Sequence, residues 1–132
     1  MKIDQDYLKR LLEACQASKK PTFNIADLEA AGLDHNDAQF EFHMMILNDQ
    51  GFVEREDRRP GIGLLKGMWS AVPLRLTASG HQFVEALSNK EVWAQIKHGF
   101  KDASITTLRT VSIKLLEGYA QKKINELLGA NG

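Results

Sequence analysis

The side chains that could catalyse a reaction or bind a metal are few and scattered along the sequence. No pair of histidines has the spacing of two metal ligands on one helix; the four are His35, His43, His81 and His98. Cys15, the single cysteine, lies on an apolar stripe where a thiol is usually an inert core residue. We therefore predict no catalytic residues, no metal site and no cofactor.

A glycine-rich stretch, GIGLLKG at residues 61–67, superficially resembles a nucleotide-binding loop. It matches neither G-x-G-x-x-G nor G-x-x-x-x-G-K-[ST], and it joins two predicted strands instead of opening a helix. We therefore predict that the chain is not an enzyme and has no small-molecule substrate.

Basic side chains in and beside this stretch are better suited to binding than to catalysis. On a flexible loop, lysine and arginine can contact a phosphate backbone or enter a minor groove. The predicted nucleic-acid contacts of this kind are Arg55, Arg58, Arg59 and Lys66. Glu54, Glu56 and Asp57 are interleaved with them, so a solvated hairpin is the alternative interpretation.

The charges cancel overall but are unevenly distributed. Seventeen basic and seventeen acidic residues give no net field that would favour nucleic acid or an anionic membrane. Residues 21–50 contain six acidic side chains and no lysine or arginine. A helix from this segment would repel phosphates rather than attract them.

Three helices are predicted in the first 51 residues. The first contains DYLKRLLEACQAS, with Asp4 or Asp6 as its cap and an apolar face of Leu8, Leu11, Leu12 and Cys15. A short second helix starts at the cap Asn24 and stops at Gly32. In the third, Asp34 is the predicted cap, Gly51 ends the helix, and the core face is Phe40, Met44 and Leu47.

Two strands and a fourth helix are predicted next. FVERE at 52–56 and MWSAVPLRL at 68–76 alternate like strands of one hairpin, and Pro73 predicts an edge strand. The segment between them predicts a long mobile tip rather than a tight turn. Thr77 is the expected cap of the fourth helix, and Gly80 inside that helix predicts a close approach to a neighbouring element.

The last segment predicts two more helices, over 89–100 and over 104–129. The final one would be roughly 37 Å long and carries two apolar tracks. One track can pack within its own chain, and burying the second predicts a twofold homodimer through this helix. The alternative is a helix buried between the first and fifth helices. The expected dimer contacts are Leu116, Ile124 and Leu127.

This order of elements predicts a mainly α fold with a small β-hairpin: a winged helix-turn-helix core with a C-terminal helical extension. We expect residues 1–88 to form the winged-helix domain. Residues 89–132 are expected to be a helical extension packed on it as one structural unit. The third helix would take the recognition position and the hairpin would be the wing.

The exposed face of the third helix allows two interpretations. Asn36, Gln39 and His43 could read base edges if the nearby carboxylates turn away. Phe42, Met45 and Ile46 form an apolar group on the same face, and such a patch usually marks a protein interface.

The chain resembles the uncharacterised bacterial and phage proteins grouped as domain of unknown function 2513. The resemblance runs nearly end to end, over MKIDQDYLKRLLE, FHMMILNDQGFVE, LTASGHQFVEAL, VWAQIK and SIKLLEGYAQ. The sequence departs from the family pattern at Phe42, where tyrosine is common, and at Ala78-Ser79, where a bulkier residue often precedes the glycine. The resemblance implies winged-helix architecture and carries over no catalytic or binding residues.

The sequence therefore predicts a cytoplasmic, non-catalytic binding protein. A single cysteine fits a reducing compartment, and no segment has the length or apolarity of a membrane span. Double-stranded DNA is the leading partner, in a regulatory role, because of the fold analogy and the wing arginines. The alternative is a protein-interaction or dimerisation module with a winged-helix fold that does not bind DNA.

Overall fold

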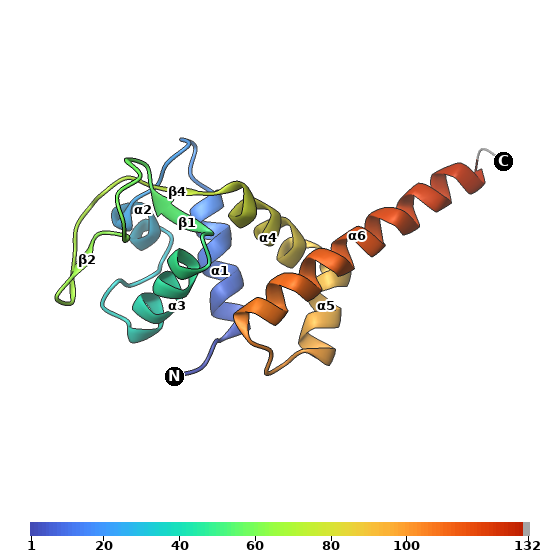
Figure 1. Ribbon diagram of the computed structural model, residues 1–132, viewed down its shortest axis with the longest axis horizontal. Coiled ribbons are helices and arrows are strands. Elements are labelled where there is room, and N and C mark those ends of the chain that lie inside the picture. The colour runs from blue at the N-terminus through green and yellow to red at the C-terminus, as the bar shows by residue number, and fades with distance from the viewer. Residues whose placement is uncertain (131–132) are drawn as a thin grey trace. The chain divides into compact units, whose positions relative to one another are not determined.

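The computed structural model describes residues 1–130, and the described chain is mainly helical with a small amount of antiparallel β structure (Figure 1). It divides into two compact units, residues 1–84 and residues 85–132. In order, the elements are α1 (Gln5–Gln16), α2 (Ile25–Ala30), α3 (Ala38–Asp49), β1 (Val53–Arg55), β2 (Leu64–Leu65), β3 (Met68–Trp69), β4 (Leu74–Leu76), α4 (Ala78–Ser88), α5 (Lys90–Gly99) and α6 (Ile105–Ala130).

Helices α1 and α2 start at short polar side chains, as the sequence predicted. The Tyr7 N–H donates to Asp4 Oδ1 at 3.0 Å, so Asp4 rather than Asp6 is the cap of α1. Asn24 and Asp27 form a reciprocal capping box at α2. The predicted apolar face of α1 is confirmed, because all four of its members are buried.

Helix α3 starts three residues later than predicted. Its cap is Asp37, whose side chain accepts the N–H of Gln39 at 3.0 Å. Asp34 instead accepts the N–H of Asn36 at 2.9 Å and shapes the turn before the helix. The predicted core face is confirmed: Phe40, Met44 and Leu47 are fully buried.

Glycines end α2 and α3 in the same way. Gly32 and Gly51 have φ values of +88° and +71°, and the residue after each donates to the carbonyl five positions earlier. This pattern is the Schellman motif, which glycine favours because it has no Cβ. Both predicted helix ends are therefore confirmed.

The β structure differs from the single hairpin that the alternation predicted. β1 pairs with β4 in the register Val53↔Leu76, while β2 pairs with β3 in a separate two-stranded sheet. Leu74 also exchanges backbone hydrogen bonds of 2.9 and 2.8 Å with Phe23. The prediction that this strand is an edge is therefore wrong, because Leu74 has partners on both sides.

The predicted mobile tip contains a tight turn. Lys66 and Gly67, between β2 and β3, have φ values of +52° and +75°. Two consecutive positive φ values are the signature of a type I′ turn, the two-residue connection whose twist suits a hairpin. The prediction of a long tip without a tight turn is therefore corrected.

The start of α4 packs on the end of α3 at a single corner. Thr77 Oγ1 accepts the N–H of Gly80 at 3.1 Å, which confirms the cap. A Cβ added at Gly80 would lie within 3.0 Å of the Phe52 carbonyl oxygen, closer than real Cβ atoms approach. The predicted close approach at Gly80 is confirmed.

Helices α1 and α3 are joined through the ring of His43, which is fully buried. Its Nε2 accepts the Asp4 N–H at 3.0 Å, and its Nδ1 donates to the Gln39 carbonyl at 2.7 Å. Burial lowers the pKa of His43, against the raising effects of the Gln39 hydrogen bond and the carboxylates of Asp4 and Asp37. The surroundings of His43 therefore favour its neutral imidazole.

Helices α5 and α6 pack against each other in the second unit. Asn89 caps α5 by accepting the Val92 N–H at 3.1 Å, and Ser104 Oγ accepts the Thr107 N–H at 3.2 Å to cap α6. Among the described residues, no helix has an apolar stretch long enough to span a bilayer.

Replacing Gly80 by alanine should destabilise the protein. Alanine normally improves a helix interior by up to about 1 kcal/mol, but here the methyl group would meet backbone that cannot rotate away, at a cost of about 1–3 kcal/mol. Urea denaturation measures the difference. Gly118→Ala is the control, because no atom lies within 4 Å of its added Cβ and it should stabilise α6. A Gly80→Ala protein as stable as the wild type would contradict this account.

Acidification should destabilise the protein through His43. Its folded pKa lies below the unfolded value of about 6.5, so the unfolded state binds the proton more readily. The contribution is fully present above that pH and is lost as the pH falls from about 6.5 towards the folded pKa. Urea titrations at pH 7.5 and pH 5.5 measure it.

Two histidine variants complete this test. His43→Leu should cost about 1 kcal/mol or more at pH 7.5, because the Asp4 N–H loses its acceptor, and should reduce the pH dependence. His98→Leu, at an exposed position, should leave that dependence unchanged. The interpretation is wrong if the His43→Leu protein keeps the full pH dependence.

Candidate functional site

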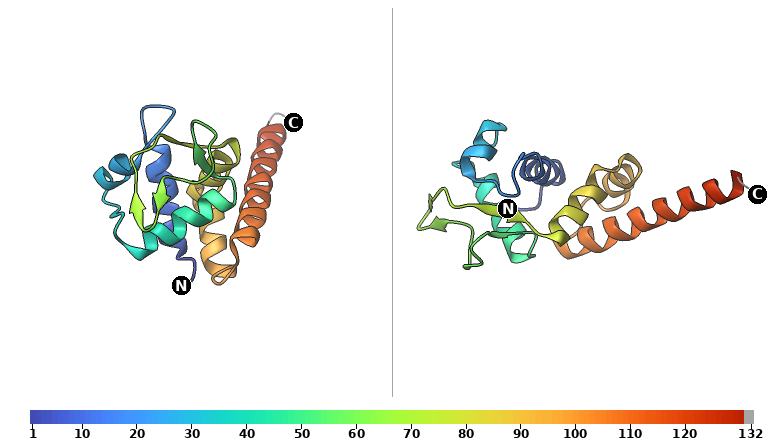
Figure 2. Two further views of the ribbon diagram at one scale, coloured as in Figure 1. Left: turned by 60° about the vertical axis from the view of Figure 1, so that its left-hand side comes forward. Right: turned by 90° about the horizontal axis from the view of Figure 1, so that it is seen from above.

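The four predicted phosphate-contacting cations lie in β1, in the loop after it and in the β2–β3 turn. Arg58 and Arg59 are the most exposed of the three arginines, with 76% and 78% of their side-chain surface accessible. Lys66 is also exposed and occupies the turn. The right-hand view of Figure 2 shows the β2–β3 hairpin projecting beyond the helices of the first unit. These cations are therefore accessible to a large partner.

Asp57 organises the arginines of the β1–β2 loop. It accepts two hydrogen bonds from the Arg55 guanidinium, at 3.0 and 2.7 Å, and the backbone N–H of Arg59 at 3.0 Å. The hydrogen bond between the two side chains raises the pKa of Arg55 and lowers that of Asp57. Arg55 is thus neutralised by its neighbour, which makes it the least available of the predicted phosphate contacts.

The remaining cations are held more loosely. Arg58 Nε lies 3.7 Å from Glu54 Oε1, while Arg75 also contacts the same carboxylate. Arg59 Nε lies 4.0 Å from Asp57 Oδ2. Within residues 1–130, no ion pair or hydrogen bond engages the Lys66 ammonium. Exposed ion pairs at such distances contribute little to stability. Phosphate oxygens could therefore replace these carboxylates as the partners of the cations.

Of the predicted base-reading residues, two lie near the surface and one does not. Asn36 is exposed in the turn before α3, and Gln39 is partly exposed in the first turn of the helix. His43 is fully buried with both ring nitrogens engaged. Its prediction as a base-reading residue is corrected, because a ligand could reach its ring only by separating α1 from α3.

The predicted apolar group on α3 is only partly exposed. Met45 exposes 47% of its surface, whereas Phe42 and Ile46 are half-buried. The ring of Phe42 packs edge-on against His43 at 5.1 Å between centroids. This face is therefore a modest apolar patch next to acidic residues.

Tyr7 was not identified from the sequence, although it lies beside this face. Its ring is 4.9 Å from that of His43, and its hydroxyl is buried without a hydrogen-bond partner in the structure. Burial, followed by the negative charges of Asp37 and Asp34, raises the pKa of Tyr7 to about 12. The side-chain oxygen of Gln39 is likewise buried without a partner. The only signal in the sequence that could have identified Tyr7 was an aromatic residue next to the apolar face of α1.

Glu29, Asp34 and His35 lie close together after α2, with their potential ligand atoms within 4.8 Å of one another. The His35 ring contacts Glu29, whose carboxylate also accepts the His35 N–H at 3.2 Å. Asp34 is already used in the turn described above. The cluster therefore has a structural role in connecting α2 to α3.

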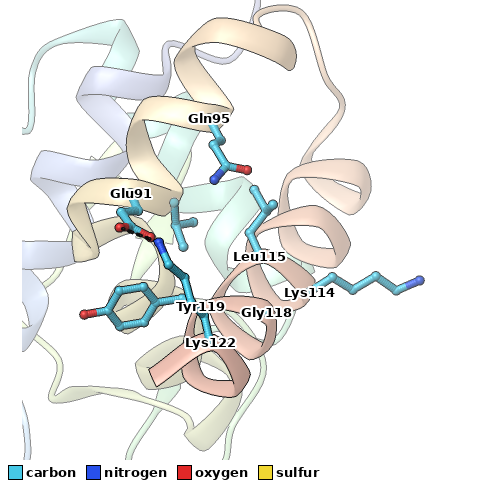
Figure 3. A pocket seen from close by; sticks show the side chains of 8 residues that line it. Glu91, Gln95, Lys114, Leu115, Gly118, Tyr119 and Lys122 are labelled. Carbon is cyan, nitrogen blue, oxygen red and sulfur yellow. Dashed lines mark ion pairs between the residues drawn. The ribbon is translucent and has the colours of Figure 1, made fainter. Parts of the chain in front are cut away.

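A groove with a volume of ≈ 310 Å³ lies between α5 and α6 (Figure 3). Val92, Leu115 and Tyr119 contribute apolar surface, and Lys122 Nζ lies 3.8 Å from Glu91 Oε1 at its edge. Gly118 lines it without any atom within 4 Å of an added Cβ. The groove therefore combines apolar surface with an exposed ion pair at its edge.

Comparison with known proteins gives a family but no activity. The family model described as hypothetical protein, domain of unknown function 2513 (DUF2513), matches residues 2–106. No curated protein and no solved structure shows significant similarity to the chain. The match covers most of the sequence, including residues 2–84 of the first unit and all of α5. The chain therefore belongs to the family of domain of unknown function 2513.

Proposed function

We propose that this protein binds double-stranded DNA without catalysing a reaction, through a winged helix-turn-helix formed by its first unit. The order of α1, the Phe23 bridge, α2, α3, β1 and β4 supports this architecture. Helix α3 takes the recognition position, and the segment between β1 and β4 is the wing. A regulatory role in the cytoplasm is the natural setting for such a protein.

The observation that carries the proposal is the charge of the wing. From residue 58 to residue 84 the sequence contains Arg58, Arg59, Lys66 and Arg75 but no aspartate or glutamate. Three of these cations are exposed and are paired weakly or not at all within the described chain. Neutralised phosphates supply most of the non-specific affinity for DNA, so this segment is the one suited to contact the backbone.

Affinity should be modest, because α3 adds little to it. Asp37 caps it and Glu41 lies in its first turn, where a recognition helix would meet the major groove. Of the predicted base-reading residues, Asn36 and Gln39 are the two that lie near the surface.

A second candidate function, a protein-interaction or dimerisation module, is favoured by α6. Ile124, Leu127 and Leu128 expose 48%, 66% and 66% of their surface, and Leu116 on the same helix is half-buried. Figure 1 shows the C-terminal part of α6 extending beyond α5. A second copy of α6 would bury them in a twofold homodimer.

Removing the wing cations tests DNA binding. Alanine at Arg58, Arg59 and Lys66 should weaken binding to duplexes of any sequence, and each lost phosphate contact should reduce the slope of log affinity against log salt by about 0.9. Fluorescence anisotropy at several salt concentrations measures both effects. The control replaces Lys2, Lys19 and Lys20, which removes the same charge elsewhere in the first unit. Tight binding to a specific sequence that survives loss of the wing cations would refute the proposed role of the wing.

The dimer is tested by placing charge on the exposed track of α6. Ile124→Glu and Leu127→Glu should each weaken association by about tenfold or more, because each buried aliphatic side chain contributes about 1.5–3 kcal/mol. Light scattering at micromolar concentrations measures the mass. Asn125→Glu, also exposed on the same helix, is the matched control and should leave the mass unchanged. A wild-type protein with a monomer mass at high micromolar concentration would exclude this dimer.

A further inference from the structure

The β2–β3 hairpin has one face turned to the protein and one face turned to solvent. Its cross-strand pairs are Leu64↔Trp69 and Leu65↔Met68, and directly opposite residues share a face of the ladder. Trp69 packs edge-on against Phe40 of α3, with 5.3 Å between ring centroids. Leu65 and Met68 lie on the other face and expose 72% and 74% of their surface. The outer face of the hairpin is therefore apolar.

The base of the hairpin holds this face in position. The Ser70 N–H donates to the Gly63 carbonyl at 2.7 Å, and Ile62 just before it is buried, with 4% exposed. A Cβ added at Gly63 would lie within 3.0 Å of Val72 and of the Ser70 carbonyl oxygen. These contacts anchor the hairpin that carries the exposed pair Leu65 and Met68.

The tip of the hairpin is narrow and carries one cation. Gly67 has no side chain, so Lys66 alone projects from the two-residue turn. Lys66 adopts a φ of +52°, a conformation that lysine rarely takes and that asparagine or glycine would adopt at lower cost. Along the chain, Lys66 therefore lies in the turn between the two exposed apolar residues, Leu65 and Met68.

The charge around the tip favours a polyanion as its partner. Asp57 is the last acidic residue before Glu85, and Arg58 and Arg59 lie in the loop that leads to the hairpin. A bilayer would also present phosphates, but two apolar side chains are too few to anchor a protein when even one myristoyl chain binds only marginally. A narrow tip with one exposed apolar face and a cation matches the chemistry of proteins that enter a DNA minor groove.

We propose that Leu65 and Met68 form a wedge that enters the minor groove of duplex DNA and partly unstacks one base step, while Lys66 contacts the groove or its phosphates. This inference rests on the proposed DNA-binding function and specifies how the wing acts. Inserted apolar side chains kink DNA towards the major groove. The wedge should therefore favour flexible steps such as TA and CA/TG, which gives some sequence preference without base contacts.

The test measures affinity and bending on the same duplexes. Duplexes labelled at both ends, with or without a central TA step, report bending by energy transfer and binding by anisotropy. Leu65→Ala with Met68→Ala should bind about tenfold more weakly, abolish the bend and leave the salt slope unchanged. Lys66→Ala should reduce the slope by about 0.9. These side chains are exposed, so the variants should fold normally.

A swapped variant, Leu65→Met with Met68→Leu, is the matched control. It keeps both apolar side chains and should retain affinity and bending close to the wild-type values. If the double alanine variant binds and bends DNA like the wild type, the wedge is wrong although DNA binding stands. If the wild-type protein does not bind duplex DNA at all, the proposed function itself fails.

A vesicle experiment separates the two sources of phosphate. Wild-type protein is sedimented with vesicles of phosphatidylserine and phosphatidylcholine, and we expect no binding that depends on Leu65 and Met68. Binding to these vesicles that the double alanine substitution removes, together with unbent DNA, would overturn the wedge in favour of a membrane-contacting tip.

Discussion

The arrangement of the first unit depends on one backbone group, the carbonyl of Phe52. It accepts the Thr77 N–H at 2.9 Å, and its oxygen lies where a Cβ at Gly80 would have to be. Thr77 Oγ1 donates to the neighbouring Gly51 carbonyl at 2.5 Å and accepts the Gly80 N–H at 3.1 Å. One threonine and one glycine therefore join the end of α3 to the start of α4. No larger residue fits at the glycine, because the atom it would meet is backbone.

The position of the proposed wing, the segment between β1 and β4, follows from this corner. With Phe52 fixed, Val53 pairs with Leu76, and the ladder reaches Leu74, which also pairs with Phe23. One further backbone hydrogen bond, from the Glu56 N–H to the Pro73 carbonyl, continues the pairing, and β2 and β3 farther along the connection form a separate hairpin. Trp69 anchors the hairpin on Phe40 of α3. The corner formed by Phe52, Thr77 and Gly80 therefore positions the exposed cations, although these three residues carry no charge.

Local signals in the sequence predicted much of the fold, and the errors arose where distant contacts decide. Caps such as Asn24 and Thr77 were identified because their hydrogen bonds join residues three apart. Asp34 and Asp37 are equally good caps by composition, so the start of α3 was misplaced. The alternation over 68–76 is continuous, whereas the strand breaks where Ser70 pairs with Gly63. His43 is buried because it accepts the N–H of Asp4, a contact between residues 39 positions apart.

If one protomer binds DNA only modestly, dimerisation through the exposed apolar residues of α6 would have a function in DNA binding. A chain with no net charge and about three available wing cations can neutralise only a few phosphates, and the acidic first turn of α3 opposes a closer approach. Joining two protomers makes the second binding event intramolecular, which raises overall affinity without any new contact to DNA. In such a dimer the slope of log affinity against log salt would double for the whole complex, while the contacts between each wing and DNA stayed the same. DNA binding by the wing and dimerisation through α6 are therefore compatible, because association through α6 would supply the affinity that a single wing lacks.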